Sequence, residues 1–261
     1  MKIAIVGASG RMGLCVARLS ASEGAEVVGA ADSPLSPHLG RDVGEAAGIG
    51  PLGVTISADT AACLLGADVV IDFSTPSALS GLLRQAMCVP VRVVSGTTPI
   101  DPDLECRIEA AAEVIPVLHA PNMSLGVQVL AELATLATEK LGPSFDVEIV
   151  ETHHRAKVDA PSGTAERLRR AVAAGRPNLD AVYGRHGDAG PRGPNEIGVH
   201  AVRGGDVFGD HTLHFLGLGE RIELTHRATS RDVFARGALR AARFLTSKAP
   251  GRYSLVDVIR A

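Results

Sequence analysis

The sequence predicts an α/β fold in which a parallel-sheet domain is joined to a second, α+β domain. Three observations lead to this prediction. Short Val/Ile runs alternate with helix-like segments in the first half, a glycine-rich turn follows the first run, and three strand-like segments follow one another directly in the second half. A length of 261 residues suits one large domain or two modest ones, at roughly 100–200 residues per domain.

Five apolar runs in the first half are predicted to be strands. Each is nearly continuous in Val, Ile or Ala and is bounded by Gly, Pro or Asp, as expected for strands buried on both faces of a parallel sheet. The strands are expected at Lys2–Val6, Ala25–Ala31, Ala67–Phe73, Val91–Gly96 and Val114–Ala120. Helices are expected between them at Arg11–Ser22, Pro76–Met87 and Pro102–Glu113. This alternation predicts βαβ units with right-handed crossovers.

The pattern changes after the fifth run. A long helix is expected at Ser124–Leu141, with Leu125, Val129, Leu133 and Leu136 on one side. The further elements are a strand at Asp146–His154, a helix at Gly163–Ala174, a long loop at Gly175–Asn195, strands at Glu196–Arg203, Val207–Leu216 and Arg221–His226, a helix at Arg231–Leu245 and a short element at Tyr253–Ile259. Strand following strand predicts a mixed or antiparallel sheet.

Composition excludes several classes of protein. The formal net charge of −3 argues against a nucleic-acid binder held by bulk electrostatics. No apolar run approaches the roughly 18 residues of a membrane-spanning helix, and the N-terminus does not resemble a signal peptide. Four cysteines without C-x-x-C spacing are expected to be buried, inert thiols in a cytoplasmic protein. They are Cys15, Cys63, Cys88 and Cys106.

The segment "IVGASGRMG" predicts a dinucleotide site. Gly7, Gly10 and Gly13 follow a strand and open a helix, so the backbone can approach a pyrophosphate at the helix N-terminus. Asp32 lies nineteen positions after Gly13, near the spacing expected for a carboxylate on the ribose. Ser33 follows it in place of a basic residue, which favours NADH over NADPH, although Arg11 could also reach a phosphate. The alternative is a glycine-rich turn in another α/β protein, in which Asp32 only caps a loop.

Three later strand ends carry Gly, hydroxyl or amide side chains. They are "DFSTP" at Asp72–Pro76, "SGTT" at Ser95–Thr98 and "HAPNMS" at His119–Ser124. Open α/β sheets bind ligands at the carboxyl ends of their strands, so together these segments favour a cofactor cleft there.

The segment "ETHHRAKVDAPSGTA", Glu151–Ala165, combines cations with a helix start. His153 and His154 point to opposite sides of an extended segment, and Lys157 follows close behind. Histidine exchanges protons near neutral pH, and a helix that opens with Ser-Gly-Thr offers N–H groups to an anion. The segment therefore predicts a site for an anionic substrate, a carboxylate, that needs a proton. A zinc site lacks the usual ligand spacing, and a third alternative is simply solvated loop charge.

Other histidines in the second half are expected to serve packing or interfaces. They are His200, His211, His214 and His226. No role is assigned to Arg155 or Asp159.

The motifs "GASGRMG", "DFSTP", "SGTT", "APNMSLGV" and above all "ETHHRAKVDAPSGTA" resemble those of the 4-hydroxy-tetrahydrodipicolinate reductase (dihydrodipicolinate reductase) family. The resemblance extends to "VRGGDVFGDHT" and "ELTHRATSR" and so covers nearly the whole chain. It implies an NAD(P)H-dependent reductase that forms tetrahydrodipicolinate with loss of water, in lysine and diaminopimelate biosynthesis. It also implies a small dicarboxylate substrate and a homotetramer. Net charge, hydropathy and ligand spacing lead us to expect no nucleic-acid partner, no membrane and no metal.

The resemblance assigns roles to individual residues. His153 is implied as proton donor and acceptor and Lys157 as proton donor, while His154, Gly163 and Thr164 are implied to bind substrate. The dinucleotide is implied to contact Gly7, Ala8, Ser9, Gly10, Arg11, Met12, Asp32, Gly96, Thr97, Thr98, Ala120, Pro121, Asn122 and Met123. A Rossmann-type domain is implied at residues 1–124 and 232–261, with an inserted α+β domain for substrate binding and tetramerisation at 125–231.

Two other functions remain open at this point. One is another NAD(P)-dependent dehydrogenase of an amino-acid pathway, which would oxidise an alcohol or amine without dehydration. The other is a non-catalytic nucleotide-sensing regulator, which would not need both His153 and Lys157.

Overall fold

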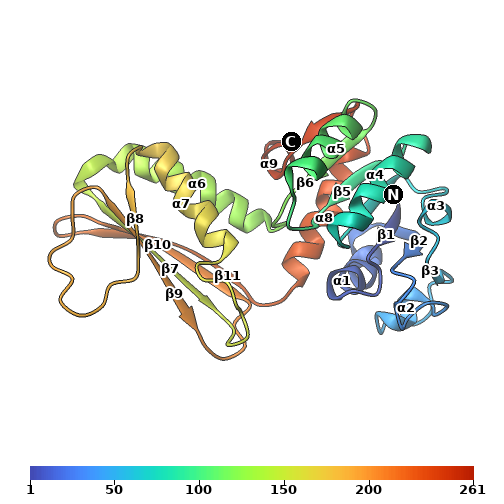
Figure 1. Cartoon of the computed structure of the whole chain (residues 1–261), viewed down its shortest axis with the longest axis horizontal. Coiled ribbons are helices and arrows are strands. Elements are labelled where there is room, and N and C mark those ends of the chain that lie inside the picture. Colours follow the sequence, from blue (N-terminus) through green and yellow to red (C-terminus); the bar gives the residue numbers. More distant parts are fainter. The chain divides into compact units, whose positions relative to one another are not determined.

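The computed structural model of the protein describes all 261 residues, and the chain forms two compact units. Unit 1 combines Met1–Leu125 with Arg231–Ala261, and unit 2 is Gly126–Ser230 (Figure 1). None of the helices is both long and apolar enough to cross a bilayer.

Unit 1 is built on a seven-stranded sheet with the order β12-β6-β5-β4-β1-β2-β3. All of its strand pairs are parallel. The strands are β1 (Lys2–Val6), β2 (Glu26–Ala31), β3 (Ile56–Ser57), β4 (Val69–Asp72), β5 (Arg92–Ser95), β6 (Pro116–His119) and β12 (Gly251–Tyr253). The order reverses between β1 and β4, which is the point where doubly wound sheets open a ligand crevice.

Helices cover both faces of this sheet because its strands are apolar on both sides. Ile3 and Ile5 of β1 pack with one group of helices, whereas Ala4 and Val6 pack with the other. The first group is α1 (Arg11–Ser20), α8 (Asp232–Leu245) and α9 (Leu255–Arg260), with the short α2 (Val43–Ala46) beside it. The second is α3 (Thr60–Cys63), α4 (Pro76–Cys88) and α5 (Pro102–Ala112) (Figure 1).

Unit 2 contains a five-stranded mixed sheet with the order β11-β10-β7-β9-β8. The strands β7, β10 and β11 pair antiparallel, and β8 and β9 continue the sheet in parallel from β7. The strands are β7 (Asp146–His153), β8 (Asp180–Tyr183), β9 (Glu196–Arg203), β10 (Gly209–Leu216) and β11 (Arg221–Ala228). Two helices, α6 (Leu125–Leu141) and α7 (Gly163–Gly175), cover one face (Figure 1).

The predicted fold class is confirmed, and several details differ. No element was expected between β2 and β4, where the chain forms α2, β3 and α3. The expected loop at 175–195 contains strand β8, which is only four residues long and carries little apolar signal. The apolar residues Val129, Leu133 and Leu136 are exposed, because α6 instead buries the side that contains Val127, Leu130 and Ala134.

Two further differences concern the C-terminal element and the thiols. The element expected at Tyr253–Ile259 is a strand followed by a helix, β12 and α9. The prediction of buried thiols holds for Cys15 and Cys63 and is wrong for Cys88 and Cys106, which lie on the outer sides of α4 and α5.

Close packing of α8 depends on a glycine. A Cβ atom at Gly237 would lie 1.7 Å from the backbone oxygen of Met123, so no side chain fits there without moving the helix. We therefore expect Gly237→Ala to lower the free energy of unfolding by about 3 kcal/mol, as overpacking in a close-packed interior does.

Gly81→Ala is the matched control for this variant. Gly81 lies within α4, where a Cβ would meet only the end of the Arg84 side chain at 4.0 Å. Alanine there should raise the free energy of unfolding by about 0.5–1 kcal/mol. Denaturant unfolding followed by circular dichroism measures both changes, and equal effects would contradict the packing explanation.

Candidate active site

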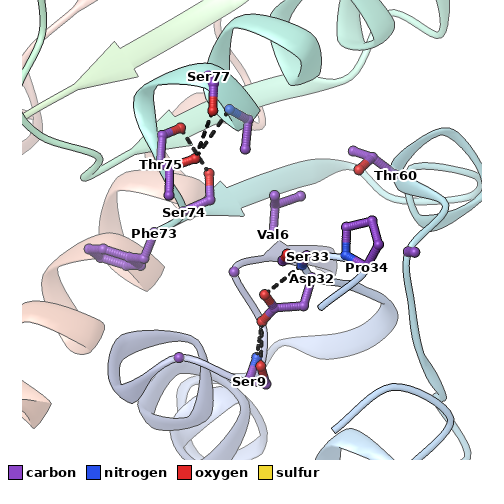
Figure 2. Close-up of a pocket in the computed structure, with 14 residues that line it drawn as sticks. Val6, Ser9, Asp32, Ser33, Pro34, Thr60, Phe73, Ser74, Thr75 and Ser77 are labelled. Atoms are coloured by element: carbon purple, nitrogen blue, oxygen red, sulfur yellow. Dashed lines mark hydrogen bonds between the residues drawn. The ribbon is translucent and has the colours of Figure 1, made fainter. Parts of the chain in front are cut away.

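A cleft of about 560 Å³ opens at the carboxyl ends of β1 and β4, where the strand order reverses. The loop after β1 contributes Gly7, Ser9 and Gly10, and the loop after β4 contributes Phe73–Thr75. Asp32 and Ser33 border it from the end of β2 (Figure 2). This is the place at which doubly wound sheets bind nucleotides.

The glycines of this cleft fit a phosphate-binding turn. Gly7 has a φ of 75°, and a Cβ there would lie 2.5 Å from the backbone oxygen of Phe73. A Cβ at Gly13 would lie 2.2 Å from the backbone oxygen of Gly7, so helix α1 can approach the turn only because residue 13 is glycine. The helix begins after Gly10 without a side-chain cap. Its N-terminus therefore presents N–H groups and positive dipole potential to an anion.

Asp32 is held in place at the cleft border. One of its oxygens, Oδ2, accepts hydrogen bonds from the Ser9 amide at 2.7 Å and the Ser9 hydroxyl at 2.6 Å (Figure 2). The other, Oδ1, accepts one from the Ser33 amide at 2.7 Å. The residues that line the cleft include no Lys or Arg. The cleft thus offers a carboxylate suited to ribose hydroxyls and no cation for a further phosphate.

A second, smaller cleft of unit 1 contains most of the remaining predicted cofactor residues. It has a volume of about 280 Å³ and is lined by Met12, Phe73, Gly96, Ala120, Pro121, Asn122, Met123, Arg231 and Phe234. Phe73 borders both clefts, and a Cβ at Gly96 would lie 2.3 Å from its ring. Four predicted residues line neither cleft: Ala8 and Thr97 are buried, and Arg11 and Thr98 are exposed.

Asp72 is a buried carboxylate that connects two of the cleft loops. Its side chain accepts hydrogen bonds from Ser95 Oγ at 2.6 Å, Thr97 Oγ1 at 2.7 Å and the amide and hydroxyl of Ser74. Burial raises its pKa above the usual value, although the hydrogen bonds from Ser74, Ser95 and Thr97 act in the opposite direction. The loops after β4 and β5 are thereby fixed to each other.

In unit 2, His153 ends strand β7 with one ring nitrogen bound and one available. Its Nδ1 is hydrogen-bonded to Glu151, which lies two residues earlier on the same face of the strand and is fully buried. Its Nε2 takes part in none of the hydrogen bonds of the chain, and the residue as a whole is buried. Burial lowers the pKa of His153 most, Glu151 raises it, and Lys157 and Arg203 lower it.

Lys157 and Asp159 form an ion pair in the loop after β7. Lys157 Nζ lies 2.7 Å from Asp159 Oδ1, and this hydrogen bond is the main reason why the pKa of Asp159 lies below its usual value. Arg203 donates to the backbone oxygen of Asp159 at 2.7 Å, which fixes the loop to strand β9. His154 is half-buried and Arg155 is exposed.

The loop ends at the start of α7, where Ser162 is the N-cap. Its hydroxyl accepts from the Ala165 amide at 3.1 Å, so the helix opens with Gly163 and Thr164 at the positions whose N–H groups bind anions. Glu151 binds both His153 and the Ser162 amide at the start of α7. Arg203 binds Glu151 and the backbone of Asp159, the partner of Lys157, so these contacts bring His153, Lys157 and the start of α7 together.

Sequence reasoning missed several polar residues that organise these two sites. They are Asp72, Glu151, Arg203, His211 and Ser162, whose backbone amide donates to Glu151. Glu151 could have been found, because strand alternation places it on the same face as His153. The others depend on contacts between distant segments, such as Arg203 with Glu151 across fifty-two positions.

His211 was expected to serve packing, and it lies against His153. The two rings meet edge to face with centroids 5.1 Å apart, and His211 Nε2 lies 3.2 Å from the Ser162 hydroxyl. Burial, followed by repulsion from His153, lowers the pKa of His211 to about 3. No group of three or more His, Cys, Asp or Glu side chains is arranged to hold a metal ion.

Comparison with known protein families accounts for both units. Residues 1–123 match the family model described as "Dihydrodipicolinate reductase, N-terminus", and residues 126–259 match "Dihydrodipicolinate reductase, C-terminus". The chain belongs to the dihydrodipicolinate reductase family. It is therefore an NAD(P)H-dependent oxidoreductase, as the sequence motifs implied.

Individual members of the dihydrodipicolinate reductase family are similar along their full lengths. A 4-hydroxy-tetrahydrodipicolinate reductase of Anaeromyxobacter sp. (strain Fw109-5) is 49% identical over 99% of this chain and 97% of its own. That of Thiobacillus denitrificans is 50% identical over 99% and 98%. The solved structure of the dipicolinate-bound dihydrodipicolinate reductase from Paenisporosarcina sp. TG-14 has a TM-score of 0.79 at 24% identity, covering 99% of both chains, and so shares the fold.

The lowered pKa of His211 predicts how the stability of this family member depends on pH. The folded protein keeps His211 neutral down to about pH 3, whereas the unfolded chain protonates it below about pH 6.5. The unfolded state then binds more protons, so the free energy of unfolding falls as the pH falls through this range. Between about pH 7 and about pH 5.5, the free energy of unfolding of His211→Asn should fall by about 1 kcal/mol less than that of the wild type.

Urea unfolding at a series of pH values measures this difference. His214→Asn is the control, because His214 lies on the same strand and on its opposite face. An equal change in pH dependence in the two variants would contradict the assignment to His211.

Proposed function

We propose that the protein reduces 4-hydroxy-tetrahydrodipicolinate to tetrahydrodipicolinate in lysine and diaminopimelate biosynthesis. Substrate, reduced dinucleotide and one proton give tetrahydrodipicolinate, oxidised dinucleotide and water. The observation that carries this proposal is the identity of about half of all residues, over 99% of the chain, with proteins of this name. Another amino-acid dehydrogenase or a nucleotide sensor is not favoured, because full-length relatives carry the reductase name.

The dinucleotide is proposed to bind unit 1, where it supplies the hydride when bound. Gly7, Ala8, Ser9, Gly10, Arg11 and Met12 would hold the pyrophosphate at the start of α1, and Asp32 would bind the adenosine ribose. Gly96, Thr97, Thr98, Ala120, Pro121, Asn122 and Met123 would border the nicotinamide side. Support comes from the crowded glycines and from the carboxylate at the cleft border. NADH is proposed as the preferred cofactor because no cation lines the cleft near Asp32.

Unit 2 is proposed to bind the substrate as a small dicarboxylate. Gly163 and Thr164 at the start of α7 would hold one carboxylate, and His154 would contact the substrate. The proposal is supported by the name of the fold relative from Paenisporosarcina, which is a dipicolinate-bound structure.

Proton delivery is assigned to His153 with Lys157 as a second donor. Hydride addition to a conjugated imine leaves electron density that has to be protonated. Nε2 of His153, which is not hydrogen-bonded within the chain, and the ammonium group of Lys157 lie four positions apart in one segment and would serve this need. The resemblance also implies a homotetramer that assembles through unit 2. Cysteine usage, charge and hydropathy support a cytoplasmic protein with neither nucleic acid nor membrane as a partner.

The proposal predicts oxidation of NADH or NADPH when the product of the preceding synthase is generated in situ. His153→Ala should lower kcat on the order of a hundredfold or more, as loss of a general acid does, while NADH binding measured by fluorescence is retained. His186→Ala, an exposed histidine of the same unit, should keep wild-type turnover. Absence of dinucleotide oxidation in the wild type would refute the function, and near wild-type turnover of the His153 variant would refute the role of that residue.

Asp32→Ala should weaken the binding of NADH and affect NADPH much less. The variant loses a charge-assisted hydrogen bond to the ribose, which is about 1.5–3 kcal/mol or roughly tenfold to a hundredfold in Kd. For NADPH, the same change also removes the repulsion between the carboxylate and the 2′-phosphate. Direct titration of both dinucleotides measures the difference.

Ser36→Ala is the control, because it removes the other side-chain partner of Ser9 without a change in charge. Equal losses of affinity for both dinucleotides in Asp32→Ala would refute the ribose role.

A further inference from the structure

Glu151 is the most completely buried ionisable side chain in unit 2, and every contact of its carboxylate is a donor. Arg203 donates to both oxygens, with Nη1 at 2.9 Å from Oε2 and Nη2 at 2.8 Å from Oε1. The Ser162 amide donates to Oε1 at 3.1 Å, and His153 Nδ1 binds Oε2. Burial raises the pKa of Glu151, but the hydrogen bonds from Arg203 and His153 outweigh it, and the pKa lies below its usual value. The carboxylate is therefore ionised and can only accept.

An ionised acceptor at Nδ1 determines the state of the His153 ring. The hydrogen bond exists only if Nδ1 carries a proton, so the neutral ring has its lone pair on Nε2. Space at Nε2 is also kept open, because a Cβ at Gly209 would lie 3.0 Å from that atom. The Glu151 contact thus selects which nitrogen exchanges protons.

We propose that Glu151 and Arg203 are positioning residues for His153: the carboxylate keeps a proton on Nδ1 and reserves Nε2 for the substrate, and the guanidinium neutralises the carboxylate. This proposal rests on the proposed function, in which His153 delivers a proton. Neither residue is a proton donor or acceptor of the reaction. Both would act through the ring that Glu151 contacts.

The guanidinium is needed because a lone buried carboxylate would hold His153 in its protonated form. Proton delivery requires a ring that gains and loses its proton near the working pH. Four charged or titratable groups face His153: Glu151 on its own strand, Lys157 in the following loop, Arg203 on β9 and His211 on β10. Lys157 is paired with Asp159, and His226 of β11 lies beyond His211. Glu151 alone among the direct contacts favours the charged ring, and Arg203 pairs with it.

Arg203 also connects His153 with the second proposed donor. One of its nitrogens, Nη2, donates both to Glu151 and to the backbone oxygen of Asp159, whose side chain pairs with Lys157. A single guanidinium group therefore fixes the strand end that carries His153 and the loop that carries Lys157. Its loss should affect both residues.

The test compares Glu151→Gln, Arg203→Gln and the control Glu148→Gln. Glu148 lies on the same strand on the opposite face, and it is likewise paired with arginines, Arg185 and Arg192, and with a histidine, His200. Glu151→Gln should lower kcat about tenfold to a hundredfold with little change in KM, as loss of a group that orients a histidine does. Glu148→Gln should retain wild-type kcat and pH dependence.

Nitrogen NMR of histidine-labelled protein, with His153 assigned from its own variant, separates positioning from mere stability. In the wild type, the neutral His153 ring should carry its proton on Nδ1. The midpoint of its titration should move to lower pH in Glu151→Gln and to higher pH in Arg203→Gln. A neutral wild-type ring protonated on Nε2, or shifts of the same sign in both variants, would overturn the proposal.

The NMR result does not depend on the reductase assay. If the wild-type protein fails to oxidise a dinucleotide with the substrate, the proposed function is refuted, while the ring tautomer still decides the role of Glu151. The wild-type measurement also requires no folded variant at position 151.

Discussion

A carboxylate that is removed from water has to be hydrogen-bonded from several directions, and each unit contains one such group at or near the end of a strand. Asp72 in unit 1 and Glu151 in unit 2 are both fully buried. Besides one neighbour two positions away, the donors that satisfy them come from other loops or strands, so the loops around each site have to adopt conformations that supply those donors. Ser95 and Thr97 in unit 1, and Ser162 and Arg203 in unit 2, are placed by this requirement.

The two carboxylates differ in the charge of their partners. Asp72 is surrounded by hydroxyl and amide groups without a cation, and burial raises its pKa. Glu151 has a guanidinium group and an imidazole, and its pKa is lowered. The first arrangement joins loops and needs no charge, whereas the second maintains a negative charge next to a proton-exchanging ring. This difference is why Glu151, and not Asp72, has a proposed part in the chemistry.

Sequence reasoning predicted most of the fold because the signals were local. Val/Ile runs bounded by Gly, Pro or Asp, and the glycine turn, each mark one element, and parallel order follows from the alternation of such runs with helix-like segments. Strands β3 and β8 were missed because they are only two and four residues long and carry too little apolar signal. Helix α6 shows a second limit of sequence-based prediction, because its apolar residues Val129, Leu133 and Leu136 are exposed. Periodicity identifies an apolar side of a helix without showing that other residues cover it.

Only those residues of the candidate site that lie within a recognisable sequence motif could be predicted. The segment 151–165 identified His153 and Lys157, and the glycine turn identified the place of the dinucleotide. Contacts such as Arg203 with Glu151, or His211 with His153, depend on strand register between β7, β9 and β10, and no local pattern specifies that register. The role of Asp159 as the ion-pair partner of Lys157 likewise required the path of the loop.

The interrupted layout of unit 1 has a consequence for synthesis on the ribosome. All strands of unit 2 leave the ribosome before α8 and β12, which complete unit 1. Until α8 and β12 emerge, the outer edge of β6 has no partner strand to pair with, and the face of the sheet that α8 covers has nothing to pack against. A nascent chain that lacks α8 and β12 would therefore expose a strand edge and an apolar face late in translation. Both are surfaces that aggregate or that chaperones bind.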